Sequence, residues 1–465
     1  MHANHMTSTE KKAVFTLASI MSLRMIGLFM VLPVFTLYAT GLKYATPFLV
    51  GISIGIYGLF QALFQIPFGT LSDRLGRKPV ILIGLVIFAI GSFIAAQAPS
   101  IYLMIFGRAL QGIGAIGSTI LAAIADLTRE DQRTKSMAIT GITIGLSFSL
   151  AMLIGPLLTK WLLISDLFYA AMFLSFIAIM ILYFFVPHAE THFHRDTTPE
   201  LKSLAKLFTT PELAKLNVGI LILHAVFTAS FIVIPINFYE SLHFAANEQW
   251  LIFLPSLLIA AIISLFCIGL AERKHQIKAY FLGGIITLAL STFLLWLASA
   301  HLILSAIGLC LFFASFSLLE AFLPSLISRT APVAQKGSAL GIYSCSQFFG
   351  IFIGGLFGGW LYGTFSFGGV YLFCITLSLF WFILAYRMQA PSHLMTQMIR
   401  LAQSHPDTTS SIAQLKIIPG MIEVTFIAED GIVYLKMART TVKHPDFIRL
   451  REQLQSETHS ETHIV

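Results

Sequence analysis

The feature that most constrains this chain is a short charged segment, residues 69–79, set between two long uncharged runs. The runs cover residues 47–68 and 80–98, and each is long enough to cross the ~30 Å hydrocarbon core of a bilayer as a helix. The segment carries one acid and three bases, and it contains two glycines that allow close backbone approach. We therefore expect a tight loop of about ten residues between two membrane spans.

The composition agrees with a membrane protein. Hydrophobic residues make up 57% of the chain and charged residues 11%, and the mean hydropathy is +0.83, which excludes a soluble monomer. Apolar runs predict twelve spans, at about residues 13–39, 47–71, 79–98, 101–125, 137–159, 166–187, 214–239, 249–271, 278–298, 300–325, 338–363 and 368–388.

The basic residues near the span ends predict the orientation. Lysines and arginines gather in the loops on one side of the predicted membrane, whereas only Lys43 and Lys160 fall on the other side. By the positive-inside rule we expect both termini in the cytoplasm, and we expect a multi-pass protein of a bacterial inner (plasma) membrane. The formal charge of +7 then reflects topology, and we predict no nucleic-acid partner.

No pattern in the sequence indicates an enzyme, a cofactor or a metal centre. The cysteines Cys267, Cys310, Cys345 and Cys374 fall in four different spans, without metal or redox spacing, so we expect packing roles. Histidines at residues 188–194 and a terminal pair at residues 459–463 could hold a metal, but polar loops and tails usually remain solvated. We predict no metal, no cofactor and no catalytic residues.

The chain repeats itself with an offset of 200 residues. Landmark residues match across this offset: Gly69 with Gly269, Lys78 with Lys278, Arg129 with Arg329, Gly141 with Gly341, and Gly155 with Gly355. Such pairs indicate two duplicated six-span halves, residues 1–187 and 214–390. We expect the joining linker at residues 188–213 to carry an amphipathic helix on the membrane surface.

The charged segment resembles the signature of the major facilitator superfamily, which reads glycine-x-x-x-aspartate-basic-x-glycine-basic-basic between helices 2 and 3. The resemblance implies a transporter with a twelve-helix all-α membrane fold. It also implies a pair between Asp126 and Arg77, and it places Asp73 at the positive N-terminal end of span 11. Both contacts would cross elements that separate when the cytoplasmic side opens. The residues expected to form this conformational latch are Gly69, Asp73, Arg74, Gly76, Arg77, Lys78 and Asp126.

Three charged residues lie inside predicted spans, where a charge costs roughly 2.5–3.5 kcal/mol on insertion scales. These are Arg24 in span 1, Arg108 in span 4 and Glu320 in span 10, all in spans that line the central cavity of the family. Residues 106–114 around Arg108 resemble the span-4 motif of proton-coupled members. Desolvation favours the neutral form of a carboxyl and water favours its release of the proton, so we expect Glu320 to carry a coupled proton. His224, the repeat mate of Arg24, could also titrate, and structural ion pairs are the alternative for each charge.

Glycines and amides supply the remaining candidates. The spacing of the span-11 glycines resembles the fifth-span motif of proton-linked antiporters, although close helix packing alone explains it equally well. The expected packing residues are Gly155, Pro156, Gly341, Gly350, Gly354, Gly355 and Gly358. Weaker candidates for a substrate cavity are Tyr57, Gln61, Gln65 and Gln347, which could equally form bonds between helices.

The composition changes after Arg387. A hairpin is predicted around a turn at residues 429–431, and short helices are predicted at 410–418 and 445–455, while residues 394–401 could be strand or helix. The residues that alternate before and after the turn are Ile422, Val424, Phe426, Val433, Leu435 and Met437. This order suggests a small α+β ferredoxin-like cytoplasmic domain over residues 391–455, followed by a disordered tail at 456–465. Drug/proton antiporters of the YajR-like type carry such a domain, and the resemblance to them covers nearly the whole chain. It implies a regulatory or assembly role for the domain.

The sequence thus predicts a monomeric, proton-coupled exporter of small molecules that works by rocker-switch alternating access in the lipid bilayer. Two alternatives remain open. One is an uptake symporter or uniporter, because sequence fixes topology but not direction. The other is a membrane sensor that signals through the C-terminal domain.

Overall fold

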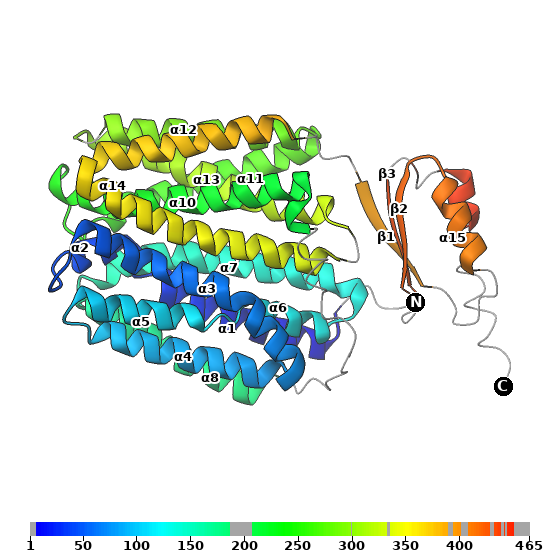
Figure 1. The fold of residues 1–465 in the computed structure, drawn as a ribbon, viewed down its shortest axis with the longest axis horizontal. Coiled ribbons are helices and arrows are strands. Elements are labelled where there is room, and N and C mark those ends of the chain that lie inside the picture. The colour runs from blue at the N-terminus through cyan, green and yellow to red at the C-terminus, as the bar shows by residue number, and fades with distance from the viewer. Residues whose placement is uncertain are drawn as a thin grey trace.

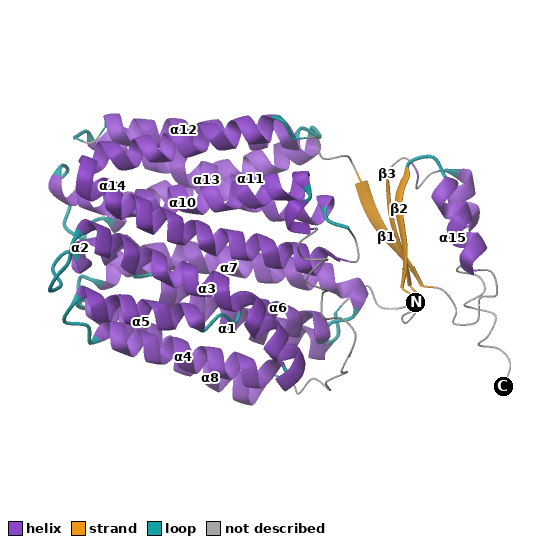
Figure 2. Ribbon diagram, viewed as in Figure 1, coloured by secondary structure: helices purple, strands orange, loops and turns teal. Residues whose placement is uncertain are grey.

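The computed structural model describes residues 6–186, 207–298, 300–332, 335–388, 394–400, 408–427, 432–438, 441 and 444–450. A bundle of long helices forms most of the molecule, and a small sheet with one helix lies beyond one end of it (Figures 1 and 2). The described residues contain eleven helices long and apolar enough to cross a membrane. The predicted linker helix falls mostly outside the described residues, as do the terminal tail and the histidines at 188–194 and 459–463.

The first half consists of eight helices that make six crossings. Their bounds are α1 (Ser8–Phe29), α2 (Leu32–Ala39), α3 (Pro47–Leu75), α4 (Arg77–Ala96), α5 (Ile101–Ile113), α6 (Gly117–Asp126), α7 (Glu130–Leu158) and α8 (Ile164–Phe185). Spans 1 and 4 were expected to be continuous, but each is broken in two. Pro33, in the first turn of α2, explains the first break, because proline lacks the N–H that a continuing helix requires.

The charged segment is not a loop of about ten residues, as the sequence had suggested. Helix α3 continues through it to Leu75, and α4 begins at Arg77, so one residue separates the two helices. That residue, Gly76, has φ 92°, a backbone conformation that favours glycine. The acid and the bases therefore project from two helix ends that meet at a sharp corner.

The second half contains α10 (Pro211–Glu240), α11 (Trp250–Arg273), α12 (Ile277–Leu297), α13 (Leu302–Thr330) and α14 (Lys336–Tyr386). The 51 residues of α14 contain spans 11 and 12, which meet at Ser366, whose φ of 56° is not helical. This junction reconciles eleven long helices with the twelve spans that the sequence predicts. The fold is therefore the all-α membrane fold expected, with two six-span halves.

Two ends of the bundle must be distinguished. We call the end with the α3–α4 corner the basic end. The other, the far end, holds the loops around Lys43 and Ser100, which form a bridge to each other. At the far end the two halves contact each other closely: the Lys160 ammonium lies 4.5 Å from the centre of the Trp250 ring, and Thr36 donates a hydrogen bond to the carbonyl of Phe231.

Glycines of α3 and α14 make the closest approach between the halves. A Cβ added at Gly355 would lie 2.5 Å from the carbonyl oxygen of Gly51 and 2.7 Å from the Cα of Gly55. Gly359 approaches Pro47 and Gly51 in the same way. Backbones this close leave no room for a side chain, so these helices pack tightly over the far part of their length.

The two halves are farther apart toward the basic end. At Gly337 and Gly341, the start of α14, an added Cβ would meet nothing within 4 Å, and the same holds for Gly141 and Gly145 of α7. Closer to the basic end than the glycine contacts, the Cys345 thiol of α14 donates a hydrogen bond to the Ala62 carbonyl of α3. The structure is thus closed at the far end and open toward the basic end.

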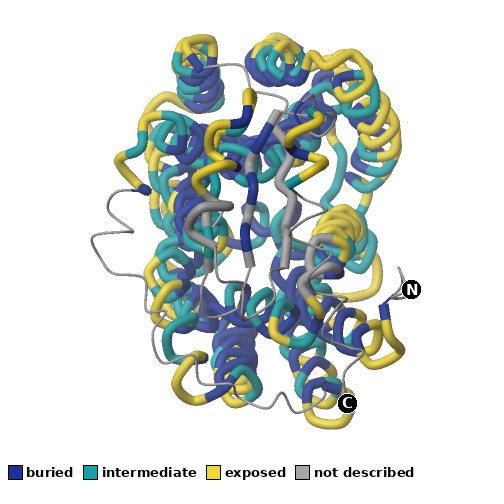
Figure 3. The backbone as a smooth tube through the Cα atoms, turned by 90° about the vertical axis from the view of Figure 1, so that its right-hand side faces the viewer, coloured by how far each residue is buried: buried dark blue, intermediate teal, exposed yellow. Residues whose placement is uncertain are grey.

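The outer surface of the bundle is apolar. Large hydrophobic side chains are exposed along the outer helices, among them Phe173 and Tyr183 of α8, and Leu265 and Phe266 of α11. Figure 3 shows exposed segments along the perimeter and buried ones inside. This pattern suits a lipid-facing surface.

The described C-terminal elements are β1 (Leu394–Arg400), α15 (Thr408–Ile417), β2 (Met421–Ile427), β3 (Ile432–Ala438) and a final helical turn at residues 445–450. The strands form an antiparallel sheet in the order β1-β3-β2. Residues 394–400, left open between strand and helix, are strand. The predicted hairpin strands are present, and the turn between them lies outside the described residues. Alternate residues Val433, Leu435 and Met437 of β3 are buried against Leu415 and Phe447, as a ferredoxin-like α+β unit requires.

Candidate functional site

The corner between α3 and α4 organises a cluster of charges at the basic end. Arg77 donates from Nε to Asp126 Oδ2 at 2.7 Å and from Nη1 to Asp73 Oδ1 at 2.5 Å. A further bond runs from Arg77 Nη1 to the hydroxyl of Ser72. One guanidinium therefore joins the end of α3, the start of α4 and the end of α6.

Two expectations about this cluster need correction. The Arg77–Asp126 pair is present, but both residues belong to the first half, so the pair does not cross between the halves. Asp73 was expected to face the start of α14, whereas the described residues give it one ion-pair partner, Arg77. The gap at the basic end is consistent with this, since a Cβ added at Gly337 or Gly341, near the start of α14, would meet nothing within 4 Å. Gly69 lies near Ser118, and Arg74 is exposed.

Arg24 sits at the centre of a buried polar network in the first half. Its side chain is 1% exposed, and its Nη2 donates to Gln61 Oε1 at 2.7 Å and to the Tyr57 hydroxyl at 3.4 Å. Gln61 in turn donates to Gln65, which is also buried. Two of the α3 residues proposed from sequence as cavity-lining, Tyr57 and Gln61, are thus bonded to a buried cation, and the third, Gln65, is bonded to Gln61.

The Arg24 network leaves donors unused. Nε and Nη1 of Arg24 have no hydrogen-bond partner among the described residues. The guanidinium lies 5.4 Å from the centre of the Phe88 ring, which offers a cation–π contact in place of an acid.

Arg108 occupies a separate place on α5. Its Nη1 donates to Gln111 Oε1 at 2.7 Å, its Nε donates to the carbonyl of Ser53, and its guanidinium lies 5.3 Å from the centre of the Tyr57 ring. Gln111 then donates to the hydroxyl of Ser92 on α4. Arg108 therefore joins α3, α4 and α5 through neutral groups, and Tyr57 lies between it and Arg24.

Glu320 lies in the second half, on α13. Its Oε1 accepts a hydrogen bond from Gln347 Nε2 at 2.9 Å, and Gln347 also contacts His224 Nε2 at 2.9 Å. The second oxygen, Oε2, lies 3.9 Å from His224 Nδ1 and has no hydrogen-bond partner among the described residues. The Glu320 side chain is 35% exposed and that of His224 is 8% exposed, while the Oε2 atom of Glu320 is buried.

A group of aromatic rings adjoins the Glu320–Gln347–His224 cluster on the side of His224. The His224 ring lies 5.6 Å from the ring of Phe316, which stacks on Phe227 at 4.5 Å. Phe148, from α7 of the other half, approaches Phe227 and Phe316 at 5.6 and 5.9 Å. Sequence reasoning missed these phenylalanines, because an aromatic residue in an apolar span carries no signal of its own.

The helix-packing glycines divide into two groups. Gly350 and Gly354 lie against the backbone of α10 at Leu221 and Ala225, within the second half, and Gly358 lies against Ala229. Gly355, one residue along, faces α3 of the first half instead. An added Cβ at Gly155 would lie 1.8 Å from the carbonyl of Met30, so this glycine and Pro156 hold α7 against the break between α1 and α2. Gly341 has no close neighbour in this conformation.

A second ionic contact at the basic end was not expected from the sequence. Glu10 is buried, and its carboxylate accepts from the Arg129 Nε and from the Arg129 backbone N–H, each at 2.9 Å. Thr7 and Glu10 also form a capping box at the start of α1. The pattern Thr-x-x-Glu before an apolar run was the available signal.

The family profile of the Major Facilitator Superfamily matches residues 17–323 and, in a second match, residues 216–408. The chain belongs to this superfamily of membrane transporters and is not an enzyme.

Individual relatives agree with the family. The inner membrane transport protein YajR of Escherichia coli strain K12 is 40% identical over 438 residues, which cover 94% of this chain and 96% of that protein. The class B tetracycline resistance protein of Escherichia coli is 34% identical over 109 residues, 23% of this chain and 26% of that protein. A solved structure of a D-xylose–proton symporter superposes with a TM-score of 0.67 at 16% identity, over 81% of this chain and 98% of that one, which shows a shared fold.

Proposed function

We propose that the protein is a proton-coupled antiporter that exports small molecules across a bacterial inner membrane by rocker-switch alternating access. The observation that carries the proposal is Glu320, an acid within a membrane span whose Oε2 has no described hydrogen-bond partner. Its neighbours Gln347 and His224 let it exist as carboxylate or as acid without a large rearrangement.

Glu320 lies where a proton and a substrate can compete. Phe316 lies against His224 of the cluster, and Phe148 of the other half lies against Phe316, so an aromatic or apolar compound could pack on these rings while its polar group contacts the carboxyl. In the protonated state the carboxyl is a weaker partner for a cation. Proton binding and substrate binding therefore oppose each other, which is what an antiporter requires.

The direction of transport follows from the orientation we propose. The bases at the α3–α4 corner support a cytoplasmic basic end, and we propose that both termini lie in the cytoplasm. The conformation described here is then open to the cytoplasm and closed to the outside. The similarity to a tetracycline resistance protein supports export, and the similarity to the inner membrane transport protein YajR supports the membrane assignment. We propose that one chain, a monomer, completes the cycle.

A vesicle screen tests this function. The protein is reconstituted with a pH-sensitive dye and a preset proton gradient, and aromatic and cationic compounds, tetracycline included, are added one at a time. A transported compound should dissipate the gradient only when the protein is present. A compound that crosses at the same rate with and without the gradient would indicate a uniporter instead.

Arg77→Ala should shift the conformational balance toward opening at the basic end. Arg77 holds Asp73 and Asp126, and Asp73 is the acid that can meet the positive start of α14 when that end closes. Both pairs lie within the first half and are made with the basic end open, so their loss matters through Asp73. Without Arg77 to orient it, Asp73 should meet the start of α14 less well, and we expect the closed basic end to lose about 1 kcal/mol, a roughly fivefold change in population. A single-cysteine reporter made by Gly341→Cys should react faster with a polar reagent.

Arg273→Ala is the matched control for Arg77→Ala, since it removes a base from the corresponding turn of the second half. In the Arg273→Ala variant, the Gly341→Cys reporter should react with the polar reagent at the same rate as in the protein that keeps Arg77 and Arg273. If Arg77→Ala leaves the rate unchanged as well, the cluster is a topology signal and not a latch.

The C-terminal unit is proposed to modulate transport. Residues 391–455, expressed alone, should be soluble and unfold cooperatively, because β3, α15 and the last helical turn bury a core of their own. A chain truncated after Arg387 should keep basal flux with an altered rate. Complete loss of flux in a correctly inserted truncation would place the unit in the transport cycle, and loss of a signalling output alone would favour a sensor.

A further inference from the structure

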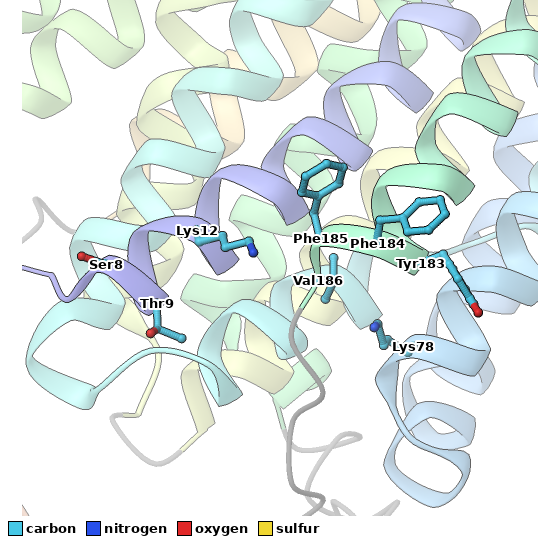
Figure 4. Close-up of a pocket in the computed structure, with 8 residues that line it drawn as sticks. All are labelled: Ser8, Thr9, Lys12, Lys78, Tyr183, Phe184, Phe185 and Val186. Atoms are coloured by element: carbon cyan, nitrogen blue, oxygen red, sulfur yellow. The ribbon is translucent and has the colours of Figure 1, made fainter.

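A pocket of about 520 Å³ opens at the basic end of the first half, where the start of α1, the start of α4 and the end of α8 meet (Figure 4). It lies away from the Glu320 cluster and from the Arg24 network. The residues that line it are Ser8, Thr9, Lys12, Lys78, Tyr183, Phe184, Phe185 and Val186.

The described residues that line this pocket include two lysines and no acid. The ammonium of Lys12 lies 5.9 Å from the centre of the Phe185 ring, and the ammonium of Lys78 makes no hydrogen bond or ion pair with the described residues. The acids closest in sequence to Lys12 and Lys78 form ion pairs with other residues. Glu10 pairs with Arg129, and Asp73 pairs with Arg77. Two positive charges therefore face the pocket without a described carboxylate partner.

At the equivalent corner of the second half, the lysines have hydrogen-bond partners within the chain. Lys278, the repeat mate of Lys78, donates from Nζ to the carbonyls of Tyr386 and Met388 at the end of α14. Lys215 donates to the carbonyl of Arg387 and to Glu212. The first half has the same helix arrangement, but among the described residues, which end here at Val186, neither Lys12 nor Lys78 makes such a bond, and a pocket lies beside this helix end.

Two helix starts add to the positive potential. Helix α1 begins at Ser8 and α4 at Arg77, so the first-turn N–H groups and the positive dipole ends of both helices lie at this corner. Figure 4 shows Ser8 and Thr9 on the Lys12 side of the pocket and Tyr183 on the Lys78 side. An anion with several oxygens matches these groups.

The outer side of the pocket is apolar and faces the bilayer. Tyr183, Phe184 and Phe185 at the end of α8 are 75%, 61% and 52% exposed. Aromatic side chains at this level of a membrane span meet the region where headgroups join acyl chains. A ligand that fits the whole pocket has an anionic head and an apolar tail.

We propose that this pocket binds an anionic phospholipid of the surrounding bilayer. The phosphate lies between Lys12 and Lys78 and accepts from both ammonium groups, while the acyl chains run along the aromatic residues of α8. A free phosphate ion would use the lysines but would leave the aromatic surface uncovered. The bound lipid joins α1, α4 and α8 in the first half, as the lysine bonds join α10, α12 and α14 in the second.

The test compares phosphatidylglycerol, phosphatidylcholine and inorganic phosphate on the purified full chain. Native mass spectrometry measures lipid retained by the protein, and thermal unfolding measures stabilisation. The unmodified protein should retain phosphatidylglycerol in preference to phosphatidylcholine. Because each lysine near an anionic lipid contributes a roughly fivefold gain, the double variant Lys12→Gln, Lys78→Gln should bind phosphatidylglycerol about 30-fold more weakly.

A second double variant, Lys11→Gln with Lys274→Gln, removes the same charge at the same end and should bind as the unmodified protein does. If the first double variant fails to fold, Lys12→Gln alone should weaken binding about fivefold. Undiminished binding in the pocket variants, or equal retention of phosphatidylcholine, overturns the proposal. Equal stabilisation by inorganic phosphate overturns the lipid assignment and leaves a small-anion site.

Discussion

Replacement of Glu320 by glutamine should abolish substrate-driven proton flux in reconstituted vesicles. Glutamine keeps the shape of the side chain and can still bond Gln347, but it cannot bind or release a proton. Insertion and thermal stability should therefore stay close to those of the unmodified protein. Proton flux, measured with an internal pH dye after substrate is added, should fall to the rate of protein-free vesicles.

Glu272→Gln is the matched control for this change. Glu272 is an exposed acid at the end of α11, outside the pathway we propose, and its loss should leave proton flux intact. Undiminished proton flux in Glu320→Gln would show that Glu320 does not carry the coupled proton. His224, the other titratable side chain of the cluster, would then be the next candidate.

Replacement of Gly355 by alanine should open the far end and stop transport. The new methyl group would overlap the backbone of Gly51 and Gly55, which cannot move aside as a flexible side chain does. Overpacking of this kind costs typically 1–3 kcal/mol, and a roughly tenfold or larger shift away from the closed far end follows. This shift is opposite in sign to the one expected for Arg77→Ala.

Spin labels on Lys43 and Thr364, which lie in different halves at the far end, measure the shift. The distance distribution should move to longer values in Gly355→Ala. Gly283→Ala, on the exposed side of α12 with nothing within 4 Å of an added Cβ, should leave the distribution unchanged. An unchanged distribution in Gly355→Ala would mean that α3 and α14 do not part during the cycle.

The span arrangement could be predicted from sequence because hydrophobic length and the 200-residue repeat are properties of the chain itself. Helix breaks were harder to locate. Pro33 marks one of them, but Gly114, at the end of α5, reads in sequence as one more small residue in a glycine-rich span. The α3–α4 corner was misjudged because charged residues suggest a loop, whereas here they continue the helix up to Gly76.

The site was predicted residue by residue but not as clusters. Charges within spans pointed to Arg24, Arg108 and Glu320. The sequence alone did not show that Gln61 forms a hydrogen bond with Arg24, or that Gln347 forms one with Glu320. Those pairings depend on how helices distant in sequence rotate against each other. The absent Asp73 contact has another cause: a transporter uses one sequence for two conformations, and the sequence does not say which one a structure will show.

The central claim is that proton and substrate move in opposite directions, and one measurement tests it most directly. Vesicles containing the full chain are loaded with a compound found in the screen, with no pH difference at the start, and substrate and internal pH are followed together. We expect substrate to leave as the interior acidifies, with both changes absent in Glu320→Gln. Substrate efflux with no change in internal pH, or with alkalinisation of the interior, would contradict proton antiport.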